Sequence, residues 1–294
     1  MESFIQIIVS GLLLGSMYAV SAVGLSLLWG ALGMLNMAHG ALLTVGAYAC
    51  YAAIVSAGLP NWLGLPLAML ASFAFGLLIY YAVVRWMYQR QGFETNIILA
   101  TIGLAMVFEN VVLKLFGAYP VAQPFGVDRS IGFEIGTVFV PWQNVVIIAV
   151  SAVLMLAIAG VLRATRMGRA IRATAQSREA ALLMGVPVAR VFAQVMGISG
   201  IVAAVSGVMI SSITTLAPTM GYDPMMKAFI VCVVGGLGNV PGAFFAAFAL
   251  GLIEAGVQFG AGTRFGYPAL LVLVIIALLW RPYGVFGRRA VVRV

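Results

Sequence analysis

The sequence predicts an all-α polytopic membrane protein. Hydrophobic side chains make up 63% of the 294 residues and charged ones only 8%, whereas a soluble domain carries roughly 25% charged residues. Residues 3–84 contain no Asp, Glu, Lys or Arg. The apolar runs are about 17 to 30 residues long and lack the ten-residue alternation of a membrane barrel. Lipid cannot form hydrogen bonds with backbone polar groups, so a membrane-spanning chain must form helices or a closed barrel. Since the barrel pattern is missing, α-helices are the remaining structure. We expect a single transmembrane domain over 1–294, a bundle of about eight helices.

Seven apolar segments are long enough, or nearly so, to cross a bilayer. The first lacks the positive start of a signal peptide and is too long for one, so we expect it to be retained as the first span. This composition excludes a soluble enzyme, a nucleic-acid-binding domain, a disordered chain and a single-span anchor. The expected spans are 4–29, 41–57, 63–86, 96–117, 142–162, 191–213 and 267–280.

An eighth apolar segment, 227–258, is predicted to be broken or re-entrant. Its middle reads GGLGNVPG over 235–242, and four glycines with a proline continue a helix poorly. The topology requires this segment to begin and end on the same side, but two full crossings need about 40 residues. The alternative is that a neighbouring span is misassigned.

Positive charges gather in three places and predict the orientation. By the positive-inside rule these clusters are cytoplasmic, which places the N-terminus outside and the C-terminus in the cytoplasm. The 118–141 loop, with three prolines and mixed charge, is expected to be external and irregular. The clusters are Arg85 and Arg90; six arginines in the 163–190 loop; and Arg281, Arg288, Arg289 and Arg293.

The sequence offers few groups for catalysis or cofactor binding. Neither lysine, Lys114 or Lys227, follows a glycine as a phosphate-binding P-loop requires. His39 is the sole histidine, and no HExxH or GxSxG motif is present. Cys50 and Cys232 lie in separate apolar runs without metal-ligand spacing. We therefore expect no enzyme activity, no cofactor and no bound metal, and any ATP must be handled by another subunit.

Three charged residues lie within the predicted membrane segments rather than at their boundaries, all of them toward a segment end. Glu109 and Lys114 lie near one end of 96–117, and Glu254 lies near the end of 227–258. Their simplest interpretation is that the side chains reach the membrane interface, although a relay of intramembrane charges is the alternative. No charge is then expected deep in the membrane to pair with a solute, which argues against ion coupling.

Arginines recur at every third position from Arg163 to Arg172. This is the spacing of a voltage-sensing helix. These arginines, however, follow a complete span, Gly168 interrupts the run, and no filter-like sequence is present. A basic helix at the lipid headgroups explains most of the arginines.

The sequence after these arginines contains Glu179-Ala180-Ala181, three residues, and then Gly185. The alanines permit close approach, and Gly185 followed by Pro187 ends a helix sharply. This pattern is similar to the EAAxxxG signature of the permeases of ABC importers, in which a cytoplasmic loop docks into the ATPase subunit. The downstream IxLP of the longer signature is missing, which indicates a divergent subfamily. The resemblance implies a coupling loop over about 163–190 with these residues at the contact: Arg172, Arg178, Glu179, Ala180, Ala181 and Gly185.

Three motifs together resemble the LivH-type permease of the branched-chain amino acid ABC importer family. They cover 11–48, the loop from 172 and 233–254, in the family's order. The resemblance implies a subunit of the bacterial inner (cytoplasmic) membrane, paired with a LivM-type permease, two ATPase subunits and a periplasmic binding protein, with no nucleic acid. Importers of other amino acids, amides, urea or aromatic acids stay open, as do a homodimer, an ion-coupled secondary transporter and a channel.

Two polar motifs within apolar sequence are candidates for the translocation path. In LNMAHG, the groups of Asn36, His39 and Gly40 either face the path or cap two helices at a turn. In GGLGNVPG, a helix start after the proline could meet a carboxylate, or the glycines could form a hinge or a close packing contact. The candidates in this second motif are Gly235, Gly236, Gly238 and Asn239.

Overall fold

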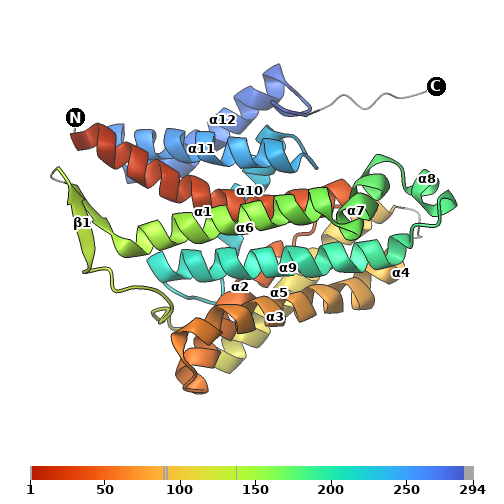
Figure 1. The fold of residues 1–294 in the computed structure, drawn as a ribbon, viewed down its shortest axis with the longest axis horizontal. Helices are drawn as coiled ribbons and strands as arrows, with labels where there is room; N and C mark the ends of the chain where they lie inside the picture. Colours follow the sequence, from red (N-terminus) through yellow and green to blue (C-terminus); the bar gives the residue numbers. More distant parts are fainter. Residues whose placement is uncertain (1, 89, 91, 137, 288–294) are drawn as a thin grey trace.

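The computed structural model describes residues 2–287 except 89, 91 and 137, and it is an all-α bundle (Figure 1). Within these residues, eight helices are long and apolar enough to span a membrane. Arg288, Arg289 and Arg293 of the C-terminal cluster lie outside the described residues. Taken with the short helices that extend them, all seven predicted spans are confirmed to within four residues. The eight helices are α1 (Glu2–Leu32), α2 (His39–Tyr51), α3 (Asn61–Ile79), α5 (Phe93–Phe116), α6 (Trp142–Ala164), α9 (Val188–Ile213), α11 (Val240–Gly260) and α12 (Gly266–Trp280).

Short irregular helices extend several of these spans. α2 continues through a π-helical turn at Ala52–Ser56, and α3 continues through another at Tyr80–Val84 into α4 (Arg85–Met87). A 3₁₀ turn at Thr263–Phe265 precedes α12. The π-helical turn brings the second span to 18 residues, His39–Ser56, and the 3₁₀ turn brings the last to 18 residues, Thr263–Trp280.

The two ends of the bundle carry different structures (Figure 1). At one end, here named the hairpin end, β1 (Gly132–Ile135) pairs antiparallel with β2 (Val138–Pro141). At the other, the arginine end, lie α7 (Arg166–Gln176) and α8 (Arg178–Leu183). The expectation that 118–141 is irregular throughout is wrong for residues 132–135 and 138–141, because both strands of a two-stranded hairpin are edge strands, where a proline is tolerated.

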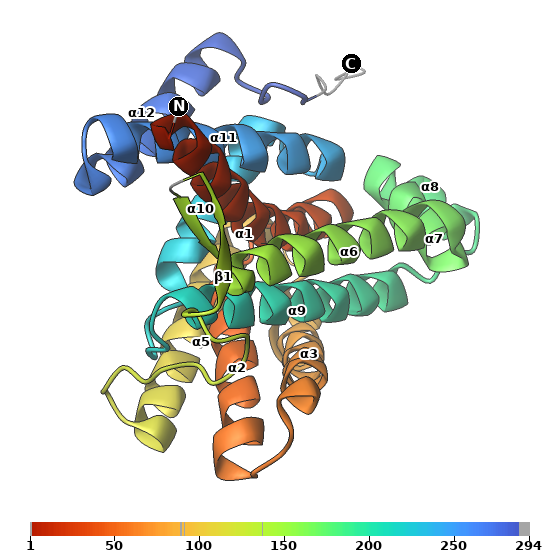
Figure 2. The ribbon, with the colours of Figure 1, turned by 60° about the vertical axis from the view of Figure 1, so that its left-hand side comes forward.

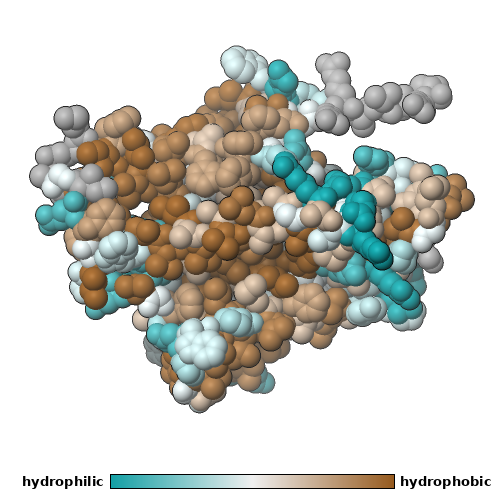
Figure 3. Space-filling model, in the orientation of Figure 1, coloured by the Kyte–Doolittle hydropathy of each residue, from teal (hydrophilic) through white to brown (hydrophobic). Residues whose placement is uncertain are grey.

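The core lies around α9, which packs on α1, α2 and α3 (Figure 2). α1 also crosses α11 closely, and at this crossing Gly251 faces the backbone of Gly11 and Gly15. Small residues allow such close approach between helices in a membrane. On the face shown in Figure 3, the middle of the bundle is mainly hydrophobic and hydrophilic residues gather toward its ends. This is the surface expected of a protein surrounded by lipid.

The segment 227–258 is broken, as predicted. α10 (Tyr222–Gly235) has 14 residues, about 21 Å at 1.5 Å per residue, which is too short to cross the bilayer core. A four-residue turn at 236–239 joins it to α11, whose 21 residues are enough to cross. The non-helical residues 214–221 lead from α9 to the start of α10, and the chain turns back at 236–239, so no neighbouring span needs to be reassigned.

Candidate functional site

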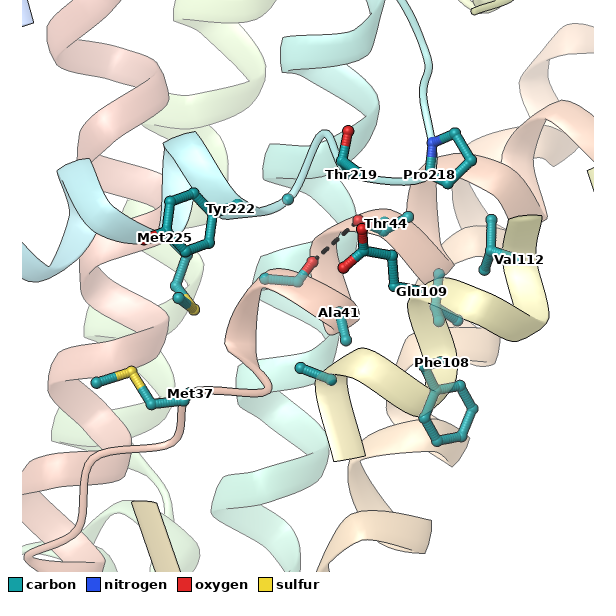
Figure 4. A pocket seen from close by; sticks show the side chains of 14 residues that line it. Met37, Ala41, Thr44, Phe108, Glu109, Val112, Pro218, Thr219, Tyr222 and Met225 are labelled. Carbon is teal, nitrogen blue, oxygen red and sulfur yellow. Dashed lines mark hydrogen bonds between the residues drawn. The ribbon is translucent and has the colours of Figure 1, made fainter. Parts of the chain in front are cut away.

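A pocket opens inside the bundle where α2 and α10 begin and α5 passes beside them (Figure 4). It encloses about 430 Å³ of space, part of it open to the surroundings. Its walls combine apolar side chains with one carboxylate and a few hydroxyl groups. The lining residues are Met37, Gly40, Ala41, Thr44, Val45, Ala105, Phe108, Glu109, Val112, Pro218, Thr219, Gly221, Tyr222 and Met225.

The start of α2 lies inside the bundle because the chain turns back after α1. The Oδ1 atom of Asn36 accepts a hydrogen bond from the N–H of Ala38 at 3.0 Å, which closes a tight turn before α2. His39, the first residue of α2, is fully buried and donates from Nε2 to the carbonyl of Ser21 at 3.2 Å. Ser21 lies about 16 Å before the end of α1 along the helix axis. α2 therefore begins in mid-bundle, with Gly40 at the pocket.

The start of α10 meets the start of α2 at two glycines. A Cβ atom added to Gly221 would lie 2.0 Å from the carbonyl oxygen of Gly40, closer than any real contact allows. Neither helix has a side-chain cap at its N-terminus. The first N–H groups of a helix have no partner within the helix. Two uncapped helix starts thus meet at the pocket.

Glu109 gives the pocket its one carboxylate. The side chain leaves α5 and points toward the α2 side of the pocket, where Thr44 lies (Figure 4). The Thr44 hydroxyl donates to the carbonyl of Gly40 at 3.1 Å. Lys114, on the same helix, lines a separate groove with Asn110. Glu109 is partly exposed and lines the pocket, so its side chain is available to a ligand there.

Glu254 lies in a second polar cluster, between α1, α10 and α11. Its side chain is only 1% exposed. Its carboxylate accepts hydrogen bonds from the Tyr18 hydroxyl at 2.5 Å and the Gln258 amide at 3.0 Å, and lies 3.4 Å from Lys227 Nζ. Lys227 also lies 3.5 Å from Asp223. The expectation that Glu254 reaches the membrane interface is therefore wrong, because Tyr18, Gln258 and Lys227 compensate its charge inside the bundle.

The arginine-rich loop forms two short helices that end in an exposed apolar tip. Ser177 caps α8 by accepting from the N–H of Ala180 at 3.3 Å. Gly185 ends α8 with a φ of +78°, and the N–H of Val186 then reaches the carbonyl of Ala181 at 2.9 Å. This is the left-handed helix end that glycine favours. It leaves the docking tip, defined as Leu182, Leu183 and Met184, exposed.

The predicted coupling residues divide into exposed and inward-facing ones. Arg172, Glu179 and Ala180 are exposed, whereas Ala181 is buried. The Arg178 guanidinium group donates to the carbonyl of Leu32 and lies over the rings of Tyr88 and Phe192, 5.4 and 5.7 Å from their centroids. Arg178 therefore joins the loop to the end of α1.

The glycine-rich turn lies far from the pocket, at the end of α1 near α8. Gly30 of α1 packs against Gly238, where a Cβ atom would lie 3.2 Å from the Gly238 carbonyl oxygen. Asn239 caps α11 through the N–H of Gly242 at 3.1 Å. Gly235 ends α10, and Gly236 begins the turn with a φ of +96°. Of the predicted path residues, the structure brings only Gly40 to the pocket, and the two motifs lie at different depths.

Sequence reasoning missed most of the pocket. It took Glu109 as an interface residue and did not single out Thr44, Thr219 or Tyr222. No local pattern marks these residues, because they come from three segments that meet only in the folded chain. Among the described residues, no group of three or more His, Cys, Asp or Glu side chains could hold a metal ion.

Comparisons with known proteins agree with this architecture. The family described as "Branched-chain amino acid transport system / permease component" matches residues 7–281. The chain is 30% identical to the high-affinity branched-chain amino acid transport system permease protein BraD of Pseudomonas aeruginosa, over 99% of this chain and 98% of the relative. It is 31% identical to the permease proteins LivH of Salmonella typhimurium and Escherichia coli, with the same coverage. The chain therefore belongs to the family of branched-chain amino acid transport permeases and is a multi-pass membrane protein.

Proposed function

We propose that this chain is the membrane-spanning permease subunit of an ATP-driven importer of branched-chain amino acids. It forms half of the translocation pathway, and a homologous LivM-type permease forms the other half. The sequence has no P-loop, so two separate ATPase subunits bind and hydrolyse ATP. The observation that carries the proposal is the docking tip, where Leu183 and Met184 are 88% and 83% exposed. An apolar patch held at the end of a basic loop is typical of a protein contact.

The charge distribution supports one orientation in the bacterial inner membrane. The arginine end, with the 163–190 loop, faces the cytoplasm by the positive-inside rule. The hairpin end, with the N-terminus and the 118–141 loop, faces outside and receives the solute from a periplasmic binding protein. This orientation places the docking tip on the side where ATP is available.

Arg178 supplies a mechanical connection from the docking tip to the pocket. It begins α8, and its guanidinium group contacts the last residue of α1, Leu32. The chain then runs through the short turn at Asn36 to Gly40, a residue of the pocket. A shift of α8 against its ATPase is thus expected to move the start of α2. The planar guanidinium group, stacked over two rings, makes this contact more directional than a lysine would.

Replacement of Leu183 by Asp tests the proposal. A charge at the centre of the tip should abolish co-purification of the ATPase subunits in mild detergent and abolish ATP-dependent leucine uptake. The protein itself should still insert and fold, because Leu183 contacts little of its own chain. Leu183→Met, which keeps the apolar surface, is the matched control and should behave as the unmodified chain. Full ATPase binding and uptake by Leu183→Asp would contradict the docking assignment.

A further inference from the structure

We propose that Glu109 is the residue that binds the ammonium group of the transported amino acid, in the pocket between α2, α5 and α10. The inference rests on the proposed function and adds to it a site and a recognition chemistry. It places the substrate against α5 instead of the glycine-rich turn that the sequence suggests.

The charge of Glu109 is not compensated by the protein. Among the described residues, no Lys, Arg or His forms an ion pair with Glu109; the ion pairs of the structure all involve Lys227. Glu109 lies about 10 Å along α5 from its end at Phe116. Glu109 is partly exposed at the pocket, and an ionisable residue within a membrane-spanning helix marks a functional site by default. The missing partner is a cation that enters the pocket.

The lining of the pocket suits the side chain of an aliphatic amino acid. Around Glu109 the walls are mainly apolar, and they suit a branched aliphatic side chain. These apolar residues are Met37, Ala41, Val45, Phe108, Val112 and Met225.

The start of α2, on the side toward which Glu109 points, suits the carboxylate of the same molecule. The helix has no side-chain cap, and Gly40 and Ala41 of its first turn line the pocket. The start of a helix attracts anions through its free N–H groups and its dipole. A zwitterion can therefore lie with its ammonium group at Glu109 and its carboxylate at α2. Only the ammonium contact is needed for the proposal, because Glu109 supplies the one full charge of the pocket.

The test uses the assembled transporter in proteoliposomes, with its ATPase subunits and binding protein, and measures uptake of radiolabelled leucine. Glu109→Gln keeps the size of the side chain and removes its charge. Loss of one charge-assisted hydrogen bond should lower uptake roughly 10- to 100-fold, with normal insertion, normal ATPase co-purification and an unchanged melting temperature. Glu109→Asp, which keeps the charge, should recover part of the rate.

Lys114→Gln is the matched control, because it removes a charge from the same helix on a groove away from the pocket. It should transport at the unmodified rate. Wild-type uptake by Glu109→Gln would overturn the proposal while leaving the importer function intact. Failure of the unmodified chain to bind any ATPase would instead contradict the proposed function.

A second measurement separates the ammonium group from other cations. Uptake by the unmodified chain is compared in sodium and choline buffers, and with and without a pH gradient. Equal rates support ammonium binding. Uptake that requires sodium or a proton gradient, with the requirement lost in Glu109→Gln, would overturn the proposal, because Glu109 would then bind an inorganic cation or a proton.

Discussion

Glu109 and Glu254 are both glutamates within membrane-spanning helices, but the protein surrounds them differently. Glu254 is 1% exposed and is held by Tyr18, Lys227 and Gln258. Glu109 faces a pocket and has no ion-pair partner in the described part of the chain. A charge that the protein compensates belongs to the fold, whereas an uncompensated charge is available to a ligand.

The cluster around Glu254 also holds the short helix α10 in place. Lys227 lies on α10, and its ammonium group is 5.4 and 5.9 Å from the ring centroids of Tyr18 and Tyr267. The Glu254 cluster thus fixes α10 to α1, α11 and α12. Tyr222 and Met225, on the same helix, line the pocket. The structural cluster therefore positions one wall of the pocket that contains Glu109.

Removal of Glu254 should have the largest effect on folding. Glu254→Ala leaves Lys227 inside the bundle without its buried partner, and breaking such a pair costs about 3–5 kcal/mol. We expect a large loss of monodisperse protein in size-exclusion chromatography and a lower melting temperature. The double variant Lys227→Met with Glu254→Leu removes both charges and should recover most of the yield. A single variant as stable as the unmodified chain would remove the distinction between the two glutamates.

Removal of the charge of Glu109 should lower uptake without destabilising the protein, in contrast to removal of Glu254. Glu109→Leu takes an unpaired carboxylate out of an apolar site, so the free energy of unfolding should stay unchanged or rise by up to about 1 kcal/mol. Leucine uptake should nevertheless fall at least as far as in Glu109→Gln. Thermal unfolding and uptake are measured on the same preparation. A Glu109→Leu protein that loses stability as Glu254→Ala does would indicate a structural role for Glu109.

Removal of one hydrogen bond from the Glu254 cluster should have a smaller effect. Tyr18→Phe deletes the hydroxyl that donates to Glu254 at 2.5 Å, and a hydrogen bond to a charged group contributes about 1.5–3 kcal/mol. The ion pair with Lys227 remains, so the protein should fold with a moderately lower melting temperature. Tyr81→Phe, the same change at an exposed tyrosine outside the cluster, is the matched control and should leave the melting temperature unchanged. Equal melting temperatures for Tyr18→Phe and the unmodified chain would show that this hydroxyl contributes little.

Much of the fold could be predicted from the sequence because long apolar runs specify membrane helices locally. The interruption of the helix at LNMAHG and the break at GGLGNVPG were both readable from residues that continue a helix poorly. The short hairpin at 132–141 was not, because strand pairing depends on contacts that composition does not reveal. The helix end at Gly185 was predictable, since only a glycine adopts its φ of +78° without strain.

The candidate site was only partly predictable, and the reason lies in the geometry of the chain. Gly40 was found through the polar residues around it. The position of Glu109 near the end of a span could be predicted, but the direction of its side chain depends on how α5 packs. His39 was singled out as the sole histidine, and the structure places it against Ser21 in the core instead of the pocket.

The sequence by itself determined that this chain is a bundle of membrane helices with a basic loop and no P-loop, because hydropathy and charge are properties of single residues and short segments. Only the tertiary structure decided which intramembrane charges are compensated. Tyr18 and Glu254 stand 236 positions apart in the chain, and Thr44, Glu109 and Thr219 come from three separate segments. The role of each charge depends on the groups within a few ångströms of it, and folding alone brings those groups together.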